Sequence, residues 1–360
     1  MQTSGQIPPW TIAAPIFAGA ILLAAVLGVG GAVIVALVAV ALAGSVFAAV
    51  HHAERIAERI GEPFGTLVLA LAVTLIEVAL IASLMAAGGE EAAGLARDTV
   101  FAAVMIILNG IIGLCLLVGG VMHRQQSFSL DGVGAALVAL GAIAILTLVF
   151  PNYTVTTPGP YYSPSQLTLI AVVTVVVYGA FIFTQTVGHR QFFLHGEAET
   201  PSAAHGRPSN AATAASAVLL LMCLCAVVLL AKKLAPSLEA GVEKMGAPNA
   251  LVGVIIAGIV LLPEGLAALR AARANRLQTS LNLALGSALA SIGLTIPAVS
   301  FLSLAMHTHL RLGVDSKSTL LLMLSLFVTT LALRTGRTII LHGVVLVTVF
   351  VVYLFTTVVP

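Results

Sequence analysis

The chain has 360 residues, of which 59% are hydrophobic and only 8% are charged, and its formal net charge is +2. Soluble domains carry about 25% charged residues, so this composition excludes a soluble enzyme. The small net charge excludes the basic surface of a nucleic-acid-binding protein, and the abundance of apolar side chains excludes a disordered chain. An integral membrane protein is therefore the expected class.

Eleven apolar runs are long enough, or nearly so, to cross a bilayer as helices, which takes roughly 20 residues each. The runs are continuous rather than alternating with a period of two, so a β-barrel is not expected. Only Gly28-Val29-Gly30-Gly31 separates the first two runs, which predicts a tight helical hairpin. The sequence thus predicts an all-α integral membrane protein with about 11 transmembrane helices, at residues 11–28, 29–50, 64–87, 99–121, 131–150, 167–187, 211–231, 249–270, 279–303, 318–333 and 338–358.

Basic residues distinguish the two sides of the predicted bundle. One side carries ten of them and the other carries six, and an excess of Lys and Arg marks the cytoplasmic side. We therefore expect a bacterial inner-membrane protein with a cytoplasmic N-terminus, and Pro360 outside. The ten are Arg55, Arg59, Arg124, Arg190, Arg207, Arg270, Arg273, Arg276, Arg334 and Arg337, and the six are Arg97, Lys232, Lys233, Lys244, Arg311 and Lys317.

The longest polar stretch, residues 188–210, divides the later spans into two groups of five. An odd number of spans per group inserts two related halves with opposite topology, which is typical of secondary transporters. The predicted organisation is one extra N-terminal helix plus two inverted five-helix repeats: residues 1–28, a first repeat at 29–187, a central cytoplasmic loop at 188–210 and a second repeat at 211–360.

Only two acidic or basic side chains lie well inside the predicted spans, Glu77 and Glu264. A charge at the bilayer centre costs about 2.5–3.5 kcal/mol on insertion scales, so such a residue is a functional candidate. The structural alternative is a protonated glutamate in a helix–helix hydrogen bond. That alternative is weaker for two glutamates at matching places in two halves, and we expect both to bind a cation or protons.

Oxygen atoms surround both glutamates in the sequence. Thr74 lies one helical turn before Glu77 on the same face. Pro263 precedes Glu264 and lacks the N–H that would bond to the carbonyl of Ile259, so that carbonyl is available to a cation. An ordinary proline kink is the alternative.

Neutral oxygens are expected from two further spans. Asn109 lies in the middle of one span, and Ser287 and Ser291 share a face of another. A packing face with hydroxyls bonded back to the chain is the alternative for the serines. Carboxylate, amide, hydroxyl and carbonyl oxygens together suit a hard cation such as calcium or sodium, rather than zinc or copper.

A short amphipathic stretch on the cytoplasmic side contains His51, His52, Glu54 and Glu62. A solvated interfacial helix explains this stretch. The functional alternative is a mouth that attracts cations and senses pH, because histidine titrates near neutrality.

Several of these residues carry a family resemblance. Residues 61–78, with Glu62-Pro63 and Glu77, and residues 248–268, with Pro263-Glu264, resemble the two signatures of the ChaA-type bacterial calcium/sodium/potassium:proton antiporters. Arg97-Asp98-Thr99, Asn109-Gly110 and residues 282–287 fit as well. The resemblance implies membership of the calcium:cation antiporter superfamily, an inverted five-plus-five helix fold, and cation binding by Glu77 and Glu264.

The function expected from these observations is secondary active transport that exchanges calcium, or also sodium or potassium, for protons. No nucleotide-binding motif or catalytic triad is present in the sequence. A passive cation channel and, more remotely, an intramembrane hydrolase are the alternatives. The expected partners are the lipid bilayer, inorganic cations and protons, with no nucleic acid and no cofactor, and a homo-oligomer is compatible with the sequence.

Overall fold

The computed structural model describes residues 8–28, 31–61, 64–88, 93–193, 209–244, 246, 248 and 250–359. Contacts divide the chain into two compact units. The first comprises residues 1–83 and 197–246, and the second comprises residues 84–196 and 247–360.

Helices dominate the described chain. Nine described helices are long and apolar enough to cross a membrane, and the bent pair of α9 and α10 brings the number to 10. The part of α3 at Leu71–Ala82 forms a further, shorter apolar helix. The all-α membrane class predicted from composition is confirmed, and the count of about 11 helices is an approximate one.

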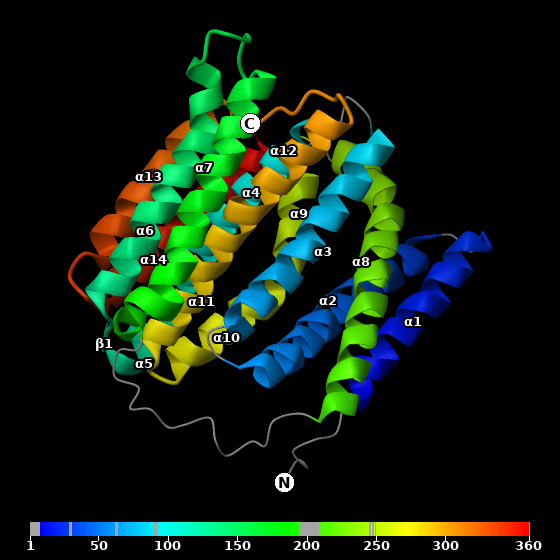
Figure 1. Ribbon diagram of the computed structural model, residues 1–360, viewed down its shortest axis with the longest axis horizontal. Coiled ribbons are helices and arrows are strands. Elements are labelled where there is room, and N and C mark those ends of the chain that lie inside the picture. Colours follow the sequence, from blue (N-terminus) through cyan, green and yellow to red (C-terminus); the bar gives the residue numbers. More distant parts are fainter. Residues whose placement is uncertain are drawn as a thin grey trace. The chain divides into compact units, whose positions relative to one another are not determined.

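The first unit consists of α1 (Pro9–Val26), α2 (Ala32–Ile60), α8 (Asn210–Lys244) and α3 (Phe64–Gly88) as far as Ser83. α2 packs against α8, and both contact α1 (Figure 1). The predicted hairpin between α1 and α2 is confirmed. Gly28 and Gly31 within it have φ angles of 86° and 107°, which glycine adopts without a steric penalty.

The helix at the predicted span 211–231 is longer than the span itself, because α8 continues as far as Lys244. An apolar run ends at the first charged pair, here Lys232 and Lys233. The helix itself continues because lysine, leucine, alanine and glutamate are good helix formers, and lysine stems can lie along apolar surface.

The second unit contains the remaining elements. They are α4 (Leu95–Met105), η2 (Ile106–Ile111), α5 (Ile112–His123), β1 (Gln125–Ser127), α6 (Leu130–Ala144), η3 (Ile145–Val149), η4 (Phe150–Tyr153), α7 (Pro164–Phe183), η5 (Thr184–Gly188), η6 (Arg190–Phe193), α9 (Ala250–Val260), α10 (Leu262–Arg273), α11 (Leu277–Ala290), η8 (Ser291–Thr295), α12 (Ile296–Ala305), α13 (Ser316–Leu333), β2 (Arg337–Ile339) and α14 (Ile340–Val358).

Small residues allow α5 and α14 to pack closely. A Cβ atom on Gly343 would lie 2.3 Å from the backbone nitrogen of Leu117, and one on Gly113 would lie 3.0 Å from that of Val347. Close backbone approach through glycine is a common basis of helix association in membranes. The two helices are also joined at one end by the short antiparallel pair of β1 and β2, in which Gln126 lies opposite Thr338.

Candidate functional site

A broken helix positions Glu264. α9 ends at Val260 and α10 begins at Leu262, and the two are bent by 56° relative to each other. The predicted single span at residues 249–270 is therefore two half-helices. The predicted interruption is confirmed, and Pro263 occupies the first turn of α10, where its missing N–H costs no helical hydrogen bond.

The break places an acidic group at the start of a helix. Glu264 lies in the first turn of α10, where the positive end of the helix dipole favours a negative charge. A single residue, Leu261, separates α9 from α10, and the carbonyl groups at a helix C-terminus lack intrahelical partners. Glu264 is half-buried, Pro263 is buried, and Ile259 lies in the last turn of α9.

α10 is held against α5, α11 and η2. A Cβ atom on Gly265 would lie 3.2 Å from Cδ1 of Ile111, so a small residue beside Glu264 allows close packing against η2. Ala268 and Ala272 pack with Cys115 of α5. These contacts hold the half-helix that carries Glu264.

Two long helical segments next to α10 each contain a π-helical turn. Leu95–His123 runs through α4, η2 and α5, and Leu277–Ala305 runs through α11, η8 and α12. η2 contacts α11, and η8 contacts α4. π-helical turns occur frequently at functional sites, and these two carry the predicted residues Asn109 and Ser291.

Asn109 is fully buried in η2. Its Nδ2 donates to Oγ of Ser325 at 2.8 Å and to the carbonyl of Met105 at 3.3 Å. Its Oδ1 is buried and has no hydrogen-bond partner among the described residues. Ser325 is thus a partner of the predicted site residue Asn109 that the sequence analysis did not identify, and its only signal in the sequence is a hydroxyl in the middle of an apolar span.

The two predicted serines lie one turn apart. Ser291 is the first residue of η8 and is 4% exposed, and Ser287 lies in α11 and is half-buried. Within the described residues, neither hydroxyl makes a side-chain hydrogen bond. This differs from Ser300 of the same long segment, whose Oγ donates to the carbonyl of Ile296 at 2.7 Å. The back-bonding alternative is therefore not seen for Ser287 and Ser291.

Glu77 and Thr74 lie in the first unit, on α3, and each is 5% exposed. They are three residues apart on one helix, as predicted. The second unit brings together Ile259, Pro263 and Glu264 on the broken helix, next to the helices that carry Asn109, Ser287 and Ser291. That Glu77 joins this group stays a prediction.

The two histidines of the predicted cytoplasmic mouth contact α1. His52 is fully buried, with its Nε2 at 3.4 Å from the carbonyl oxygen of Thr11. The ring of His51 lies 5.7 Å from that of Trp10. Glu54 is exposed, and Glu62 lies outside the described residues. In the described chain, no three His, Cys, Asp or Glu side chains gather in a way that could hold a metal ion.

The chain is a bundle of apolar helices, and one of its spans is broken beside an acidic residue. This architecture is typical of secondary membrane transporters. The chain belongs to the family described as sodium/calcium exchanger protein, whose sequence profile matches residues 30–187 and 215–359. It is thus a multi-pass membrane transporter of the calcium:cation antiporter superfamily, and not an enzyme.

Known proteins resemble the chain over most of its length. An ionic transporter of Sinorhizobium fredii, y4hA, is 48% identical over 99% of this chain and 98% of its own length. The sodium-potassium/proton antiporter ChaA of Escherichia coli is 36% identical over 90% of this chain and 89% of its own.

Solved structures share the fold. The structure of native YfkE has a TM-score of 0.72 and 17% identity, covering 98% of this chain and 100% of its own. The H+/Ca2+ exchanger CAX has a TM-score of 0.72 and 15% identity, covering 96% of this chain and 87% of its own.

Proposed function

We propose that this chain exchanges calcium, and also sodium or potassium, for protons, with alternating access around a site that contains Glu77 and Glu264. The observation that carries the proposal is the position of Glu264, in the first turn of a half-helix at a break within a membrane span. Transporters commonly bind ions at such breaks. The buried position of Glu77 on α3 supports the same assignment.

Charge balance couples the two ions in this proposal. Two ionised carboxylates neutralise a divalent cation, and two protonated carboxylates are neutral without one. Either load lowers the cost of exposing the site to the low-dielectric membrane core. The protein then changes between its inward-facing and outward-facing conformations only when the site holds a cation or protons. With two unneutralised carboxylates, the conformational change does not take place. Exchange follows without ATP.

The cargo follows from the ligand chemistry and from the relatives. The proposed ligands are all oxygen atoms, which suit a hard cation. They are the two carboxylates, the amide oxygen of Asn109, the hydroxyls of Thr74, Ser287 and Ser291, and backbone carbonyls. The relative ChaA is described as a sodium-potassium/proton antiporter, and the structural neighbour CAX as an H+/Ca2+ exchanger. Calcium is our first choice, with sodium and potassium as further cargoes.

Orientation is part of the proposal. The side with ten basic residues faces the cytoplasm of a bacterial inner membrane, together with the N-terminus and residues 188–210. The C-terminus then lies outside. His51, His52 and Glu54 would be near the cytoplasmic end of α2.

Proteoliposome flux with an imposed pH gradient tests the proposal. An antiporter accumulates calcium against its gradient when protons flow the other way, and each ion can be offered alone to rank the cargoes. A cation channel would instead conduct without a proton requirement, and an intramembrane hydrolase would move no ion. Either of those results would refute the proposal.

A further inference from the structure

A cavity of about 250 Å³, lined by both apolar and charged side chains, lies at one end of the second unit. It lies among the start of α4, the start of α13, the end of α14 and the loop before α13. Its charged lining consists of Arg97, Asp98, Arg311, Asp315 and Lys317. None of these belongs to the site proposed for transport.

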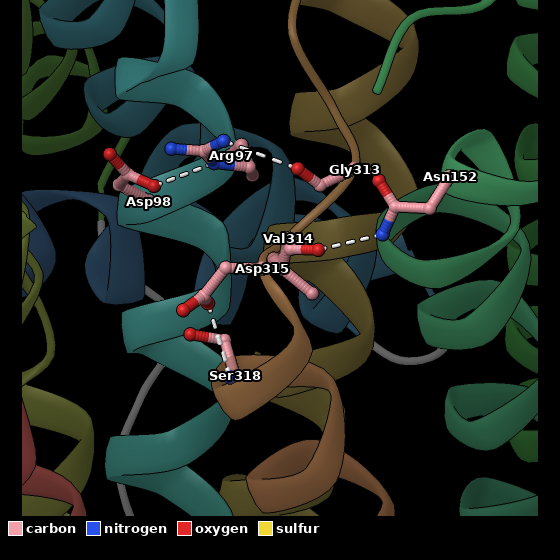
Figure 2. A network of polar contacts seen from close by, with 7 residues as sticks. All are labelled: Arg97, Asp98, Asn152, Gly313, Val314, Asp315 and Ser318. Atoms are coloured by element: carbon pink, nitrogen blue, oxygen red, sulfur yellow. Dashed lines mark hydrogen bonds and ion pairs between the residues drawn. The ribbon is translucent and has the colours of Figure 1, made fainter. Parts of the chain in front are cut away.

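The loop that carries Arg311 is held firmly to its surroundings. The backbone N–H of Arg311 donates to the carbonyl of Ala93 at 3.0 Å. Arg97 donates to the carbonyl of Gly313 at 3.2 Å, and Asn152 donates to that of Val314 at 2.6 Å (Figure 2). The wall of the cavity is therefore built in advance of any ligand.

Gly313 shows how tightly this loop is packed. A Cβ atom on Gly313 would lie 2.0 Å from Oδ1 of Asn152 and 2.6 Å from Cβ of Pro160. Only glycine fits there without displacing the segment at residues 151–160. Gly313 therefore allows the loop that carries Arg311 to lie close against this segment.

Both acidic side chains of the cavity already have partners. Nε of Arg97 donates to Oδ1 of Asp98 at 2.7 Å, and this ion pair neutralises both groups. Oδ1 of Asp315 accepts from the backbone N–H of Ser318 at 3.1 Å and so caps α13 (Figure 2). An N-cap carboxylate is balanced by the positive end of its helix.

The remaining basic groups retain donors for a ligand. Nζ of Lys317 donates to the carbonyl of Thr356 at 2.6 Å, and an ammonium group has two further hydrogens. The guanidinium of Arg311 is exposed, and it makes no hydrogen bond or ion pair within the described part of the chain. With three cationic and two anionic side chains, the cavity carries a net charge of +1, and Arg311 and Lys317 are the cationic groups that retain unused donors.

We propose that Arg311 and Lys317 form a binding site for a phosphate-type anion. Arginine suits this ligand because its planar group can donate two parallel hydrogen bonds to phosphate oxygens. Phe101 and Leu321 add apolar surface beside these charges. The site lies where three spans begin or end, which is the depth of lipid headgroups. A phospholipid headgroup and free phosphate both present the phosphate oxygens that this site would bind.

Thermal unfolding of the full-length protein in an uncharged detergent tests this proposal. The probes are dioctanoyl phosphatidylglycerol, inorganic phosphate, and dioctanoylglycerol, which has the same chains without the phosphate. A ligand at about ten times its Kd should raise Tm by roughly 2 °C or more. We expect phosphatidylglycerol to do so and dioctanoylglycerol not to. A rise with inorganic phosphate as well would assign a free anion as a ligand, and a rise with the lipid alone would assign the headgroup.

Arg311→Gln should remove the rise in Tm, because the substitution removes the guanidinium while breaking no hydrogen bond of the described fold. Arg311→Lys should retain part of the rise, since it keeps the charge. The matched control is Arg276→Gln, an exposed arginine before α11, which should respond like the parent. No rise in the parent with either phosphate probe, or an equal rise in Arg311→Gln, would overturn the proposal. These measurements do not involve transport, so their outcome is independent of the proposed antiport.

Discussion

The side-chain amide of Asn109 donates to Oγ of Ser325 at 2.8 Å, across 216 residues of sequence. Ser325 uses its own hydrogen on the carbonyl of Leu321 at 2.7 Å, so its oxygen must accept from Asn109. This fixes which way the amide of Asn109 is turned and leaves its Oδ1 without a described partner. A buried amide oxygen that accepts no hydrogen bond is a suitable ligand for a cation.

Ser325→Ala should therefore affect both stability and binding. The Asn109 amide would lose its shorter hydrogen bond in a buried place, which costs about 1–3 kcal/mol. The freed amide could also turn, and cation affinity should fall several-fold. Thermal unfolding in detergent and a cation titration measure the two effects.

Thr348→Val is the control for Ser325→Ala. It also removes a hydroxyl from a membrane helix, but the Thr348 hydroxyl is exposed and bonds only to the carbonyl of Val344. We expect it to change neither quantity. If Ser325→Ala behaves the same way, the bond to Asn109 does not stabilise the fold or orient the amide.

Pro263→Ala tests the broken helix. Alanine restores an N–H that can bond to the carbonyl of Ile259, and the helix should straighten in part. Cation affinity should fall, while stability stays equal or rises by roughly 1 kcal/mol.

Pro297→Ala is a matched control for Pro263→Ala, because Pro297 is also buried near the start of a helix, α12. That helix continues a single long span rather than a bent pair, so we expect little change in affinity. An unchanged cation affinity in Pro263→Ala would reduce Pro263 to a packing residue.

Orientation can be tested with two exposed histidines of the second unit. In a background without Cys115, Cys223 and Cys225, His189→Cys should react with an impermeant thiol reagent only from the cytoplasmic side. His307→Cys should react only from outside. The reverse pattern in intact cells and inverted vesicles would refute the predicted topology.

Much of the fold could be predicted from local sequence. The hairpin at Gly28 and Gly31 and the interruption beside Pro263 both follow from the chemistry of single residues. The candidate site was harder to predict than the fold, because no clear pattern in the sequence indicates the π-helical turns at Asn109 and Ser291. The bond from Asn109 to Ser325 and the pairing of β1 with β2 join residues more than 200 positions apart. Composition and periodicity carry no information about such pairs.

The carboxylates provide the decisive test of antiport. Glu77→Gln and Glu264→Gln should each abolish proton-coupled cation uptake in proteoliposomes while expression stays largely intact. Glutamine keeps the size and an oxygen ligand, but it does not titrate. In the parent, cation affinity should fall as pH falls, because protons compete for the same oxygens, and this dependence should flatten in either variant.

Glu239→Gln, on an exposed position of α8, is the control and should retain the pH dependence of the parent. If both site variants still accumulate cations against an imposed pH gradient at near-parent rates, these glutamates do not couple the two ions. The coupling group would then have to be sought at His51, at His52 or among the acidic residues of the external side.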